Sequence, residues 1–255
     1  MKNLNLLEEK INSKQKTLLM FDYDGTLCPI KPKPDLAKIN PKLARKIETL
    51  AKKPHLKIAI ITGRSIKDFL RVSSFTSKKI TVSGLHGGEI LDNGQLTLKK
   101  RTPKEEQIAK NFLMDIQKQC QNLDGILLED KGFSIALHYR MATEKIAEKA
   151  INIFRELMHK YNAEEFFKIQ TGKKVVEMLP SKFQKSTIVK ELIQKHPEYA
   201  PFYFGDDITD ICAFEEVKKH NGICIGITPL PFEYENLIDV EISQENLEKF
   251  ILQLK

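Results

Sequence analysis

The sequence predicts an α/β protein in which a discontinuous parallel-sheet core carries an inserted α+β module. Short apolar runs alternate with helical spacing in both outer parts of the chain, and the middle shows a different order of elements. The length of 255 residues fits one core and one smaller module. We expect a core formed by residues 1–103 and 180–255, and a module formed by residues 104–179.

The first part of the core reads as alternating strands and helices. Residues 17–21 form an apolar run that leads directly into a polar loop, which is typical of a buried strand. Residues 41–53 place apolar side chains at helical spacing, and residues 56–61 form a second apolar run. Strand, helix, strand implies a parallel pair. A third strand near residues 80–82 precedes a hairpin turn at Asn93-Gly94.

The middle of the chain predicts a module with its own sheet. Two helices are expected, each followed by two strands, which is a compact α+β arrangement. The helices are expected at residues 103–120 and 143–161, and the strands at residues 125–129, 133–139, 166–170 and 175–179. After this module the α/β pattern resumes, with helices at residues 186–194 and 244–254 and strands at residues 202–204 and 223–227.

Composition narrows the class of protein. Apolar residues make up 41% and charged residues 29% of the chain, as in a soluble globular protein. The net charge of +7 comes from scattered lysines, so we interpret most of them as surface charges and expect no nucleic-acid partner. The apolar segments are too short for a signal peptide or a membrane span, which predicts a cytoplasmic protein without a membrane partner. The cysteines show no metal-ligand spacing and are expected to be reduced: Cys28, Cys120, Cys212 and Cys224.

Four polar clusters lie beside inferred strand ends or helix starts. They contain the pair Asp22 and Asp24, then Thr62, Lys185 and Asp206. Alone, Asp24-Gly25 could close an ordinary turn, and a lysine could be a surface charge. Together the clusters supply a nucleophile, a proton donor, phosphate-binding donors and acids for a cation, which are the requirements of phosphoryl transfer.

Each of these residues receives an expected role. Asp22 is the nucleophile that forms an aspartyl-phosphate, which splits hydrolysis into two easier steps. Asp24 protonates the leaving oxygen and then takes a proton from the attacking water. The Thr62 hydroxyl and the Gly63 amide bind the phosphate, and Lys185 adds a mobile positive charge.

A metal ion is expected beside these residues. Asp206, Asp207 and Asp210 crowd several acids at one strand end, which is costly without a cation. Magnesium takes oxygen ligands and suits such a site. The ligand spacing of a calcium-binding EF-hand loop is missing.

The motifs resemble the haloacid dehalogenase superfamily. They are D-Y-D-G-T-L at 22–27, T-G-R at 62–64, Lys185 and G-D-D at 205–207. Within that superfamily the chain resembles trehalose-6-phosphate phosphatases over nearly its whole length. The motifs that carry this likeness are G-L-H-G-G-E at 84–89, E-D-K at 129–131, H-Y-R at 138–140 and G-D-D-I-T-D at 205–210. The resemblance implies a Rossmann-like core with a mobile cap domain.

The resemblance also implies ligands for the metal and the sugar. Magnesium would be held by the carboxylates of Asp22 and Asp206 and by the backbone carbonyl at Asp24. The cap would bind the sugar through charged side chains, which make strong hydrogen bonds to hydroxyl groups. They are Glu129, Lys131, Arg140, Lys173 and Glu177. The alternative is that these charges are only the solvated faces of strands.

The resulting hypothesis is magnesium-dependent hydrolysis of trehalose 6-phosphate to trehalose and phosphate. A phosphatase of the same superfamily acting on sucrose phosphate or a mannosyl phosphoglycerate is the main alternative. A signalling receiver domain would not need the inserted module, and a silent binding module would need neither Asp22 nor Asp24. The expected partner is a small sugar phosphate. The sequence leaves the oligomeric state open, and a monomer is compatible with it.

Overall fold

The computed structural model of the chain describes residues 2–31, 34–172, 174–230 and 237–255. Contacts within the chain divide it into two compact units. The core unit consists of Met1–Leu98 and Gln184–Lys255, and the inserted unit consists of Lys99–Phe183. Each unit has its own sheet and its own apolar core.

In the described part of the core unit, eight strands form one sheet in the order β12-β11-β10-β1-β2-β3-β4-β5. The strands from β12 to β3 in this order are parallel, while β4 and β5 form the expected antiparallel hairpin at the edge. The strands are β1 (Thr17–Phe21), β2 (Leu56–Ile61), β3 (Ile80–Gly84), β4 (Glu89–Asp92), β5 (Gln95–Leu98), β10 (Ala200–Gly205), β11 (Ile223–Thr228) and β12 (Val240–Ser243).

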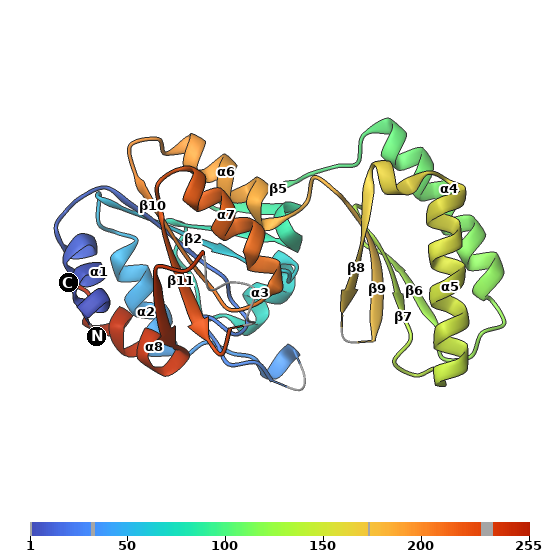
Figure 1. Cartoon of the computed structure of the whole chain (residues 1–255), viewed down its shortest axis with the longest axis horizontal. Coiled ribbons are helices and arrows are strands. Elements are labelled where there is room, and N and C mark those ends of the chain that lie inside the picture. Colours follow the sequence, from blue (N-terminus) through green and yellow to red (C-terminus); the bar gives the residue numbers. More distant parts are fainter. Residues whose placement is uncertain (1, 32–33, 173, 231–236) are drawn as a thin grey trace. The chain divides into compact units, whose positions relative to one another are not determined.

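Helices cover both faces of this sheet (Figure 1). Alternate residues of β1 explain why: Leu19 and Phe21 belong to one buried cluster, and Leu18 and Met20 belong to the other. A strand buried on both faces has a continuous apolar sequence, as residues 17–21 have. The helices on the first face are α1 (Lys2–Asn12), α2 (Pro41–Leu50), α3 (Ile66–Val72) and α8 (Gln244–Gln253), and those on the second are α6 (Lys185–Lys195) and α7 (Ile211–Lys219).

The sheet order brings the segments that follow β1, β2 and β10 together at the carboxyl ends of the strands. Strand β1 pairs in parallel with β10 on one side and with β2 on the other. Phe21, its last residue, is opposite both Phe204 and Ile60. The residues that follow these three strands therefore lie at the same carboxyl edge, where open α/β sheets bind their ligands.

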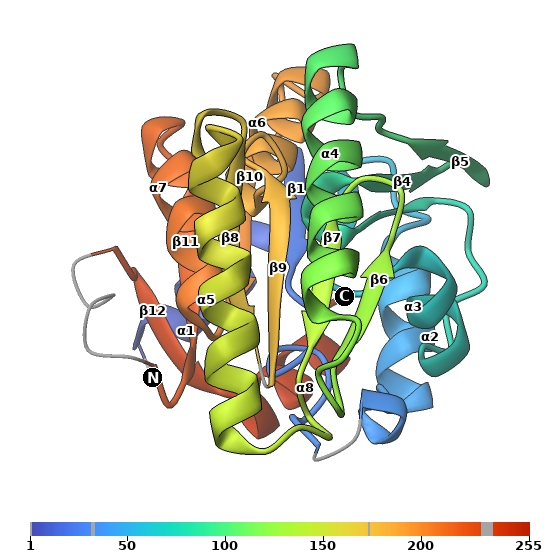
Figure 2. The ribbon, with the colours of Figure 1, turned by 90° about the vertical axis from the view of Figure 1, so that its right-hand side faces the viewer.

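The inserted unit is an antiparallel sheet in the order β6-β7-β9-β8, with α4 and α5 packed on one face (Figure 2). Phe112 of α4 and Phe154 of α5 meet edge to face at the centre of this core, with ring centroids 4.9 Å apart. The elements are α4 (Pro103–Cys120), β6 (Leu127–Asp130), β7 (Ile135–His138), α5 (Glu144–Lys160), β8 (Phe167–Gly172) and β9 (Val175–Pro180). Short 3₁₀ helices in the two units are Pro34–Leu36, Leu85–Gly87, Ala163–Glu165 and Ile208–Asp210.

The unit boundaries lie a few residues outside the positions expected from the sequence. The side chain of Arg101 is 2% exposed and donates to the Phe133 carbonyl and to Asp130, so it belongs to the inserted unit. Thr102 caps α4 through a reciprocal pair of hydrogen bonds with Glu105. At the second crossing, Phe183 packs against Phe133.

The sequence analysis did not foresee α1, α3, α7 and β12. Helix α3 has only seven residues and β12 only four, too few for a clear hydrophobic period. Helix α7 directly follows the acidic G-D-D-I-T-D motif, whose polarity hides the start of the helix. In the described part of the chain, no helix has the length and apolarity needed to span a membrane.

Candidate active site

Asp22 and the turn after it begin the site. Asp22 follows the last residue of β1, is 6% exposed, and its backbone N–H donates to the Phe204 carbonyl at 2.8 Å. The chain then turns, with the N–H groups of Leu27 and Cys28 donating to the Tyr23 carbonyl. Gly25 has a φ of +91°, and a Cβ there would lie 1.9 Å from Oδ2 of Asp206. The turn therefore requires glycine, because the Asp206 carboxylate occupies that space.

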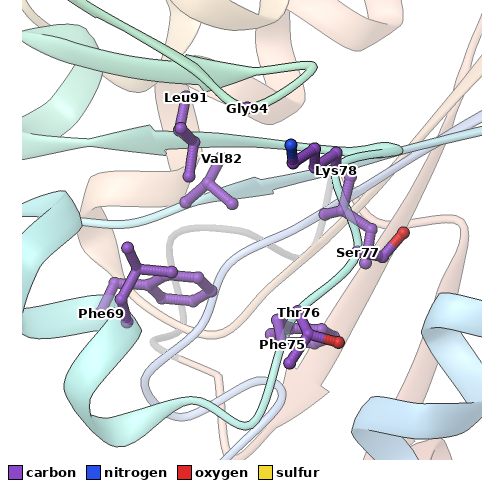
Figure 3. A pocket seen from close by; sticks show the side chains of 10 residues that line it. Phe69, Phe75, Thr76, Ser77, Lys78, Val82, Leu91 and Gly94 are labelled. Atoms are coloured by element: carbon purple, nitrogen blue, oxygen red, sulfur yellow. The ribbon is translucent and has the colours of Figure 1, made fainter.

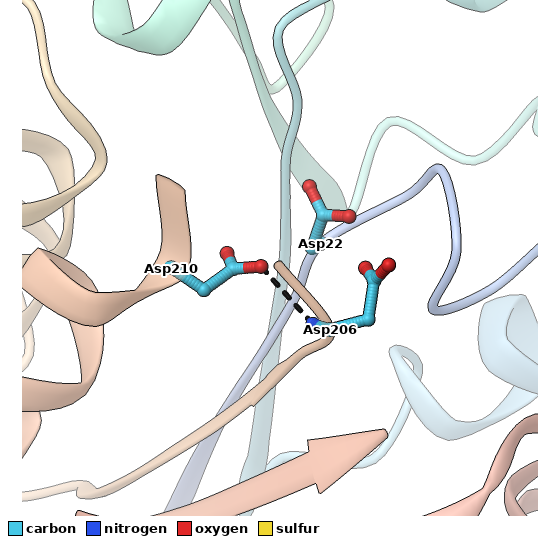
Figure 4. A group of neighbouring side chains, drawn as sticks. All are labelled: Asp22, Asp206 and Asp210. Atoms are coloured by element: carbon cyan, nitrogen blue, oxygen red, sulfur yellow. Dashed lines mark hydrogen bonds between the residues drawn. The ribbon is translucent and has the colours of Figure 1, made fainter. Parts of the chain in front are cut away.

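Three carboxylates converge at this edge of the sheet (Figure 4). Asp22, Asp206 and Asp210 each offer one oxygen, and these atoms lie within 4.8 Å of one another. Thr26 donates from its hydroxyl to Oδ1 of Asp206 at 3.1 Å. The crowding predicted for Asp206 and Asp210 is therefore present, and it includes the candidate nucleophile. Asp207 instead caps the short helix Ile208–Asp210, accepting a hydrogen bond from the N–H of Thr209.

Lys185 lies between two of these acids. Its Nζ donates to Oδ1 of Asp22 and to Oδ1 of Asp210, each at 2.7 Å, and the side chain is 3% exposed. Asp210 is fully buried and also accepts hydrogen bonds from the Tyr203 hydroxyl and from the backbone N–H groups of Asp206 and Asp207. Both oxygens of Asp210 therefore already accept hydrogen bonds from the protein.

The electrostatics of the cluster favour a cation. Burial raises the pKa of Asp22 well above its usual value, with Lys185 opposing that shift and Asp210 and Asp206 adding to it. Burial, followed by repulsion from Asp210 and Asp207, raises the pKa of Asp206 to about 6. Although burial disfavours the charge of Lys185, Asp210 and Asp22 raise its pKa. One buried cation thus faces several acids, and an all-oxygen donor set of this kind fits a hard divalent ion.

The T-G-R loop lies at the end of β2. Thr62 is buried, its N–H donates to the Ser83 carbonyl, and its Oγ1 accepts the N–H of Arg64 at 3.1 Å. A Cβ on Gly63 would lie 3.0 Å from Nε2 of His86, so the loop passes close to that imidazole. The Asp24 carboxylate faces Arg64 in a two-point ion pair. In the sequence, Arg64 stands within the T-G-R motif and Tyr203 within the strand expected at residues 202–204, and neither had an expected role.

The inserted unit brings several of the predicted sugar-binding residues together. Strand pairing sets Glu129 opposite Ala136, and Ala136 opposite Glu177, so both glutamates share one face of the sheet. Val176 and Met178, the neighbours of Glu177, belong to the core under the helices, so this shared face is the opposite one.

Further polar contacts occur around these glutamates. Lys131 Nζ lies 3.1 Å from Oε1 of Glu177, which also accepts from the Ser134 hydroxyl at 2.5 Å. His138 lies 2.9 Å from Glu129 through Nε2 and Oε2. The sequence analysis assigned no role to Ser134 or His138, although His138 stands in the H-Y-R motif. Arg140 follows β7 and is exposed, and Lys173 lies outside the described residues.

A separate small hollow of about 70 Å³ lies in the core unit (Figure 3). Its described lining comes from α3, the segment that follows it, and the β3–β5 hairpin region, with Phe69, Phe75 and Lys78 among the residues. None of the described lining residues belongs to the acidic cluster or to the T-G-R loop. The hollow is therefore not part of the candidate active site.

Solved structures support the architecture. An Aspergillus fumigatus trehalose-6-phosphate phosphatase aligns with a TM-score of 0.72 at 21% identity, covering 98% of this chain and 96% of that one. This likeness confirms the expected α/β fold with its separate antiparallel insertion.

Sequence comparisons identify the family. Residues 20–240 match the trehalose-phosphatase family. A probable trehalose-phosphate phosphatase of Sinorhizobium fredii is 31% identical over 216 residues, which cover 83% of this chain and 77% of that protein. The trehalose-6-phosphate phosphatase of Escherichia coli is 28% identical over 215 residues, with 81% and 76% covered. The chain therefore belongs to the trehalose-phosphatase family, within the haloacid dehalogenase superfamily that its motifs resemble.

Proposed function

We propose that this chain hydrolyses trehalose 6-phosphate to trehalose and inorganic phosphate, with Asp22 as the nucleophile. The observation that carries the proposal is the position of Asp22 at the end of β1, held by Lys185 and next to Asp206. Lys185 binds Oδ1 of Asp22, so we assign the attack on phosphorus to Oδ2. Family membership supports a phosphorylated sugar as the substrate.

The reaction has two steps. In the first, the Asp22 carboxylate attacks phosphorus, the ester P–O bond breaks, and Asp24 gives its proton to the departing sugar oxygen. Trehalose leaves, and the phosphoryl group remains on Asp22. In the second, water attacks phosphorus, Asp24 takes its proton, and the Asp22 carboxylate is restored as phosphate leaves.

Donors for the phosphate oxygens are available on two elements. Lys185 uses two of its three N–H bonds on Asp22 and Asp210, which leaves one for a phosphate oxygen. The Thr62 hydroxyl accepts from the N–H of Arg64, so its own hydrogen is available to donate. We assign the backbone amide of Gly63 to the same task.

The acids would hold one magnesium ion. Asp22 and Asp206 would supply carboxylate oxygens, and the resemblance assigns a third ligand to the backbone carbonyl at Asp24. When bound, magnesium would neutralise the charge of the acids and of the phosphate oxygens. Asp210 is better suited to hold Lys185, because hydrogen bonds from the protein already engage both of its oxygens.

The inserted unit would act as the cap and bind the sugar. Glu129, Lys131 and Glu177 supply charged groups on its helix-free face, where they suit a ligand rich in hydroxyls. Arg140 and Lys173 complete the proposed set. Closure of this cap would exclude water until the sugar is seated.

A substrate panel tests the proposal. Phosphate release is measured from trehalose 6-phosphate, sucrose 6-phosphate, glucose 6-phosphate and p-nitrophenyl phosphate, with magnesium and with a chelator. We expect a metal-dependent preference for trehalose 6-phosphate. Preference for another sugar phosphate would keep the mechanism and overturn the substrate, and turnover that is unaffected by the chelator would overturn the metal site.

A further inference from the structure

Arg64 forms a two-point ion pair with Asp24. Nε of Arg64 donates to Oδ2 at 2.7 Å, and Nη2 donates to Oδ1 at 2.5 Å. The side chain of Arg64 is 11% exposed, so the pair is partly sheltered from solvent. A planar guanidinium that contacts both oxygens of a carboxylate fixes the plane of that carboxylate, which a single point charge cannot do.

The surroundings hold Arg64 in place. Its guanidinium lies over the ring of Tyr23, 5.7 Å from the centroid, and Tyr23 is fully buried. Its backbone N–H donates to Oγ1 of Thr62, and its carbonyl accepts the N–H of Leu85 at 2.8 Å. Both the side chain and the backbone of Arg64 are therefore anchored by the core unit.

The G-L-H-G-G-E turn supports this anchoring. Leu85 and His86 have φ values of 52° and 55°, a left-handed conformation that persists in residues with a Cβ only when the surroundings enforce it. A Cβ on Gly84 would lie 2.8 Å from the Arg64 carbonyl oxygen, so the turn packs directly on the T-G-R loop. Glu89 accepts the backbone N–H of Ile66 at 2.5 Å and fixes the far side of the loop.

We propose that Arg64 is a positioning residue, which orients the Asp24 carboxyl group for proton transfer to the leaving sugar oxygen. Each Asp24 oxygen accepts one N–H from Arg64 and keeps a second lone pair, and the proton to be transferred is carried on one of these. The proposal rests on the phosphatase reaction argued above. Arg64 cannot supply the proton itself, because a guanidinium remains charged in proteins. It acts through Asp24, and the G-L-H-G-G-E turn keeps it aligned.

The test separates orientation of the acid from binding of phosphate. Arg64→Lys, Asp24→Asn and the double variant are compared with wild type in single turnovers of trehalose 6-phosphate and of p-nitrophenyl phosphate. A nitrophenolate leaves without help from an acid, whereas a sugar alkoxide needs a proton. We expect Arg64→Lys to slow sugar release about 10- to 100-fold, because small misplacements of a catalytic group cost that much. Nitrophenolate release, and the KM measured separately at steady state, should change little. The double variant should be no slower than Asp24→Asn.

Arg71→Gln is the matched control. Arg71 makes a similar two-point pair with Asp35, with its Nη2 2.6 Å from Oδ1, but on the exposed surface. This variant should keep wild-type rates on both substrates. Arg64→Ala supplies a second approach if the lysine variant folds poorly, because ethylguanidine in solution should restore sugar release without changing nitrophenolate release.

Equal losses on both substrates, or additive losses in the double variant, would overturn the proposal and show that Arg64 acts on phosphate or on the fold. Wild type and Asp24→Asn are measured first, so the two proposals fail in different ways. A wild type without phosphatase activity would overturn both proposals. A normal wild type with a slow Asp24→Asn variant and an unimpaired Arg64→Lys variant would overturn only the role of Arg64.

Discussion

Lys185 joins the candidate nucleophile to the buried acid behind it, donating to Asp22 and to Asp210 at 2.7 Å each. All three side chains are buried, so the positive charge of Lys185 compensates the negative charge of the two acids in the core. The same contacts orient Asp22 at the end of β1. One residue therefore links the stability of the core unit to the geometry of its site.

Replacing Lys185 by methionine should cost both stability and activity. Removing one partner from a buried ion pair leaves uncompensated charge and costs about 3–5 kcal/mol in unfolding free energy. Magnesium should restore part of this stability, because a bound cation would replace the lost charge. Urea denaturation with and without magnesium measures both effects. Lys195→Met, which breaks an exposed pair with Asp92, should change stability by less than about 1 kcal/mol. Equal effects of the two variants would contradict the role of Lys185.

Asp22→Asn should abolish turnover of every phosphate ester while the fold is kept. An amide is a poor nucleophile, and Asn keeps the shape of the side chain and one oxygen that can accept the hydrogen bond from Lys185. Phosphate release and thermal unfolding are measured on the same preparation. Turnover near the wild-type rate would remove the covalent mechanism.

The metal-free protein should lose stability as pH rises from about 4 through about 6. Burial and the neighbouring acids raise the pKa of Asp206 from 3.8 to about 6, so the folded state binds more protons than the unfolded state in this range. Unfolding free energy then falls with rising pH, because its slope follows the difference in bound protons. Urea denaturation in a chelator measures the slope, and Asp206→Asn should flatten it. Magnesium should oppose the loss, because it binds the deprotonated acids. If the slope of unfolding free energy against pH is the same in Asp206→Asn as in wild type, the pH dependence comes from other groups.

Much of the candidate site could be predicted because its residues follow strand ends. The continuous apolar run of β1 identified a buried strand, and parallel pairing with β2 and β10 then brings Asp22, Thr62 and Asp206 to one edge. Lys185 was predicted from its position at the start of an expected helix. Its hydrogen bonds to two acids depend on α6 packing against the sheet, which local sequence does not encode.

Other relationships depend on side-chain packing. The ion pair between Asp24 and Arg64 joins residues that are 40 positions apart in the sequence, and no hydrophobic periodicity predicts it. Tyr203 reads as an ordinary strand residue, yet its hydroxyl meets Asp210 in the core. Helix α3 and strand β12 were not predicted for a different reason. They have only seven and four residues, which is too few to show a hydrophobic period.

Tyr203→Phe should lower kcat several-fold with little change in KM. The variant keeps the ring and removes one hydrogen bond to the Asp210 carboxylate, so Lys185 and Asp22 lose part of their support. A hydrogen bond to a charged group contributes about 1.5–3 kcal/mol. Steady-state kinetics and urea denaturation are the measurements. Tyr199→Phe is the control, because its hydroxyl donates to the Pro54 carbonyl away from the acids. It should cost about 1 kcal/mol of stability, the value for a neutral hydrogen bond, and leave kcat unchanged. An equal loss of kcat in both variants would rule out a specific role for Tyr203.

Glu177→Gln should lower kcat/KM for trehalose 6-phosphate without slowing hydrolysis of a phosphate ester that has no sugar. Glu177 accepts hydrogen bonds from Lys131 and Ser134, and in the proposed complex it would also bind a sugar hydroxyl. Hydrogen bonds to charged groups contribute about 1.5–3 kcal/mol, so kcat/KM for trehalose 6-phosphate should fall about 10- to 100-fold. The value for p-nitrophenyl phosphate should stay near wild type, since that substrate has no sugar.

Asp115→Asn is the control for Glu177→Gln. Asp115 pairs with Lys160 between α4 and α5, on the helical side of the same unit, so its loss should leave both substrates unaffected. Steady-state kinetics on the two substrates decide the question. If Glu177→Gln slows both substrates equally, the residue supports the inserted unit as a whole. If it slows neither, the charged groups on this face are solvated and the sugar binds elsewhere.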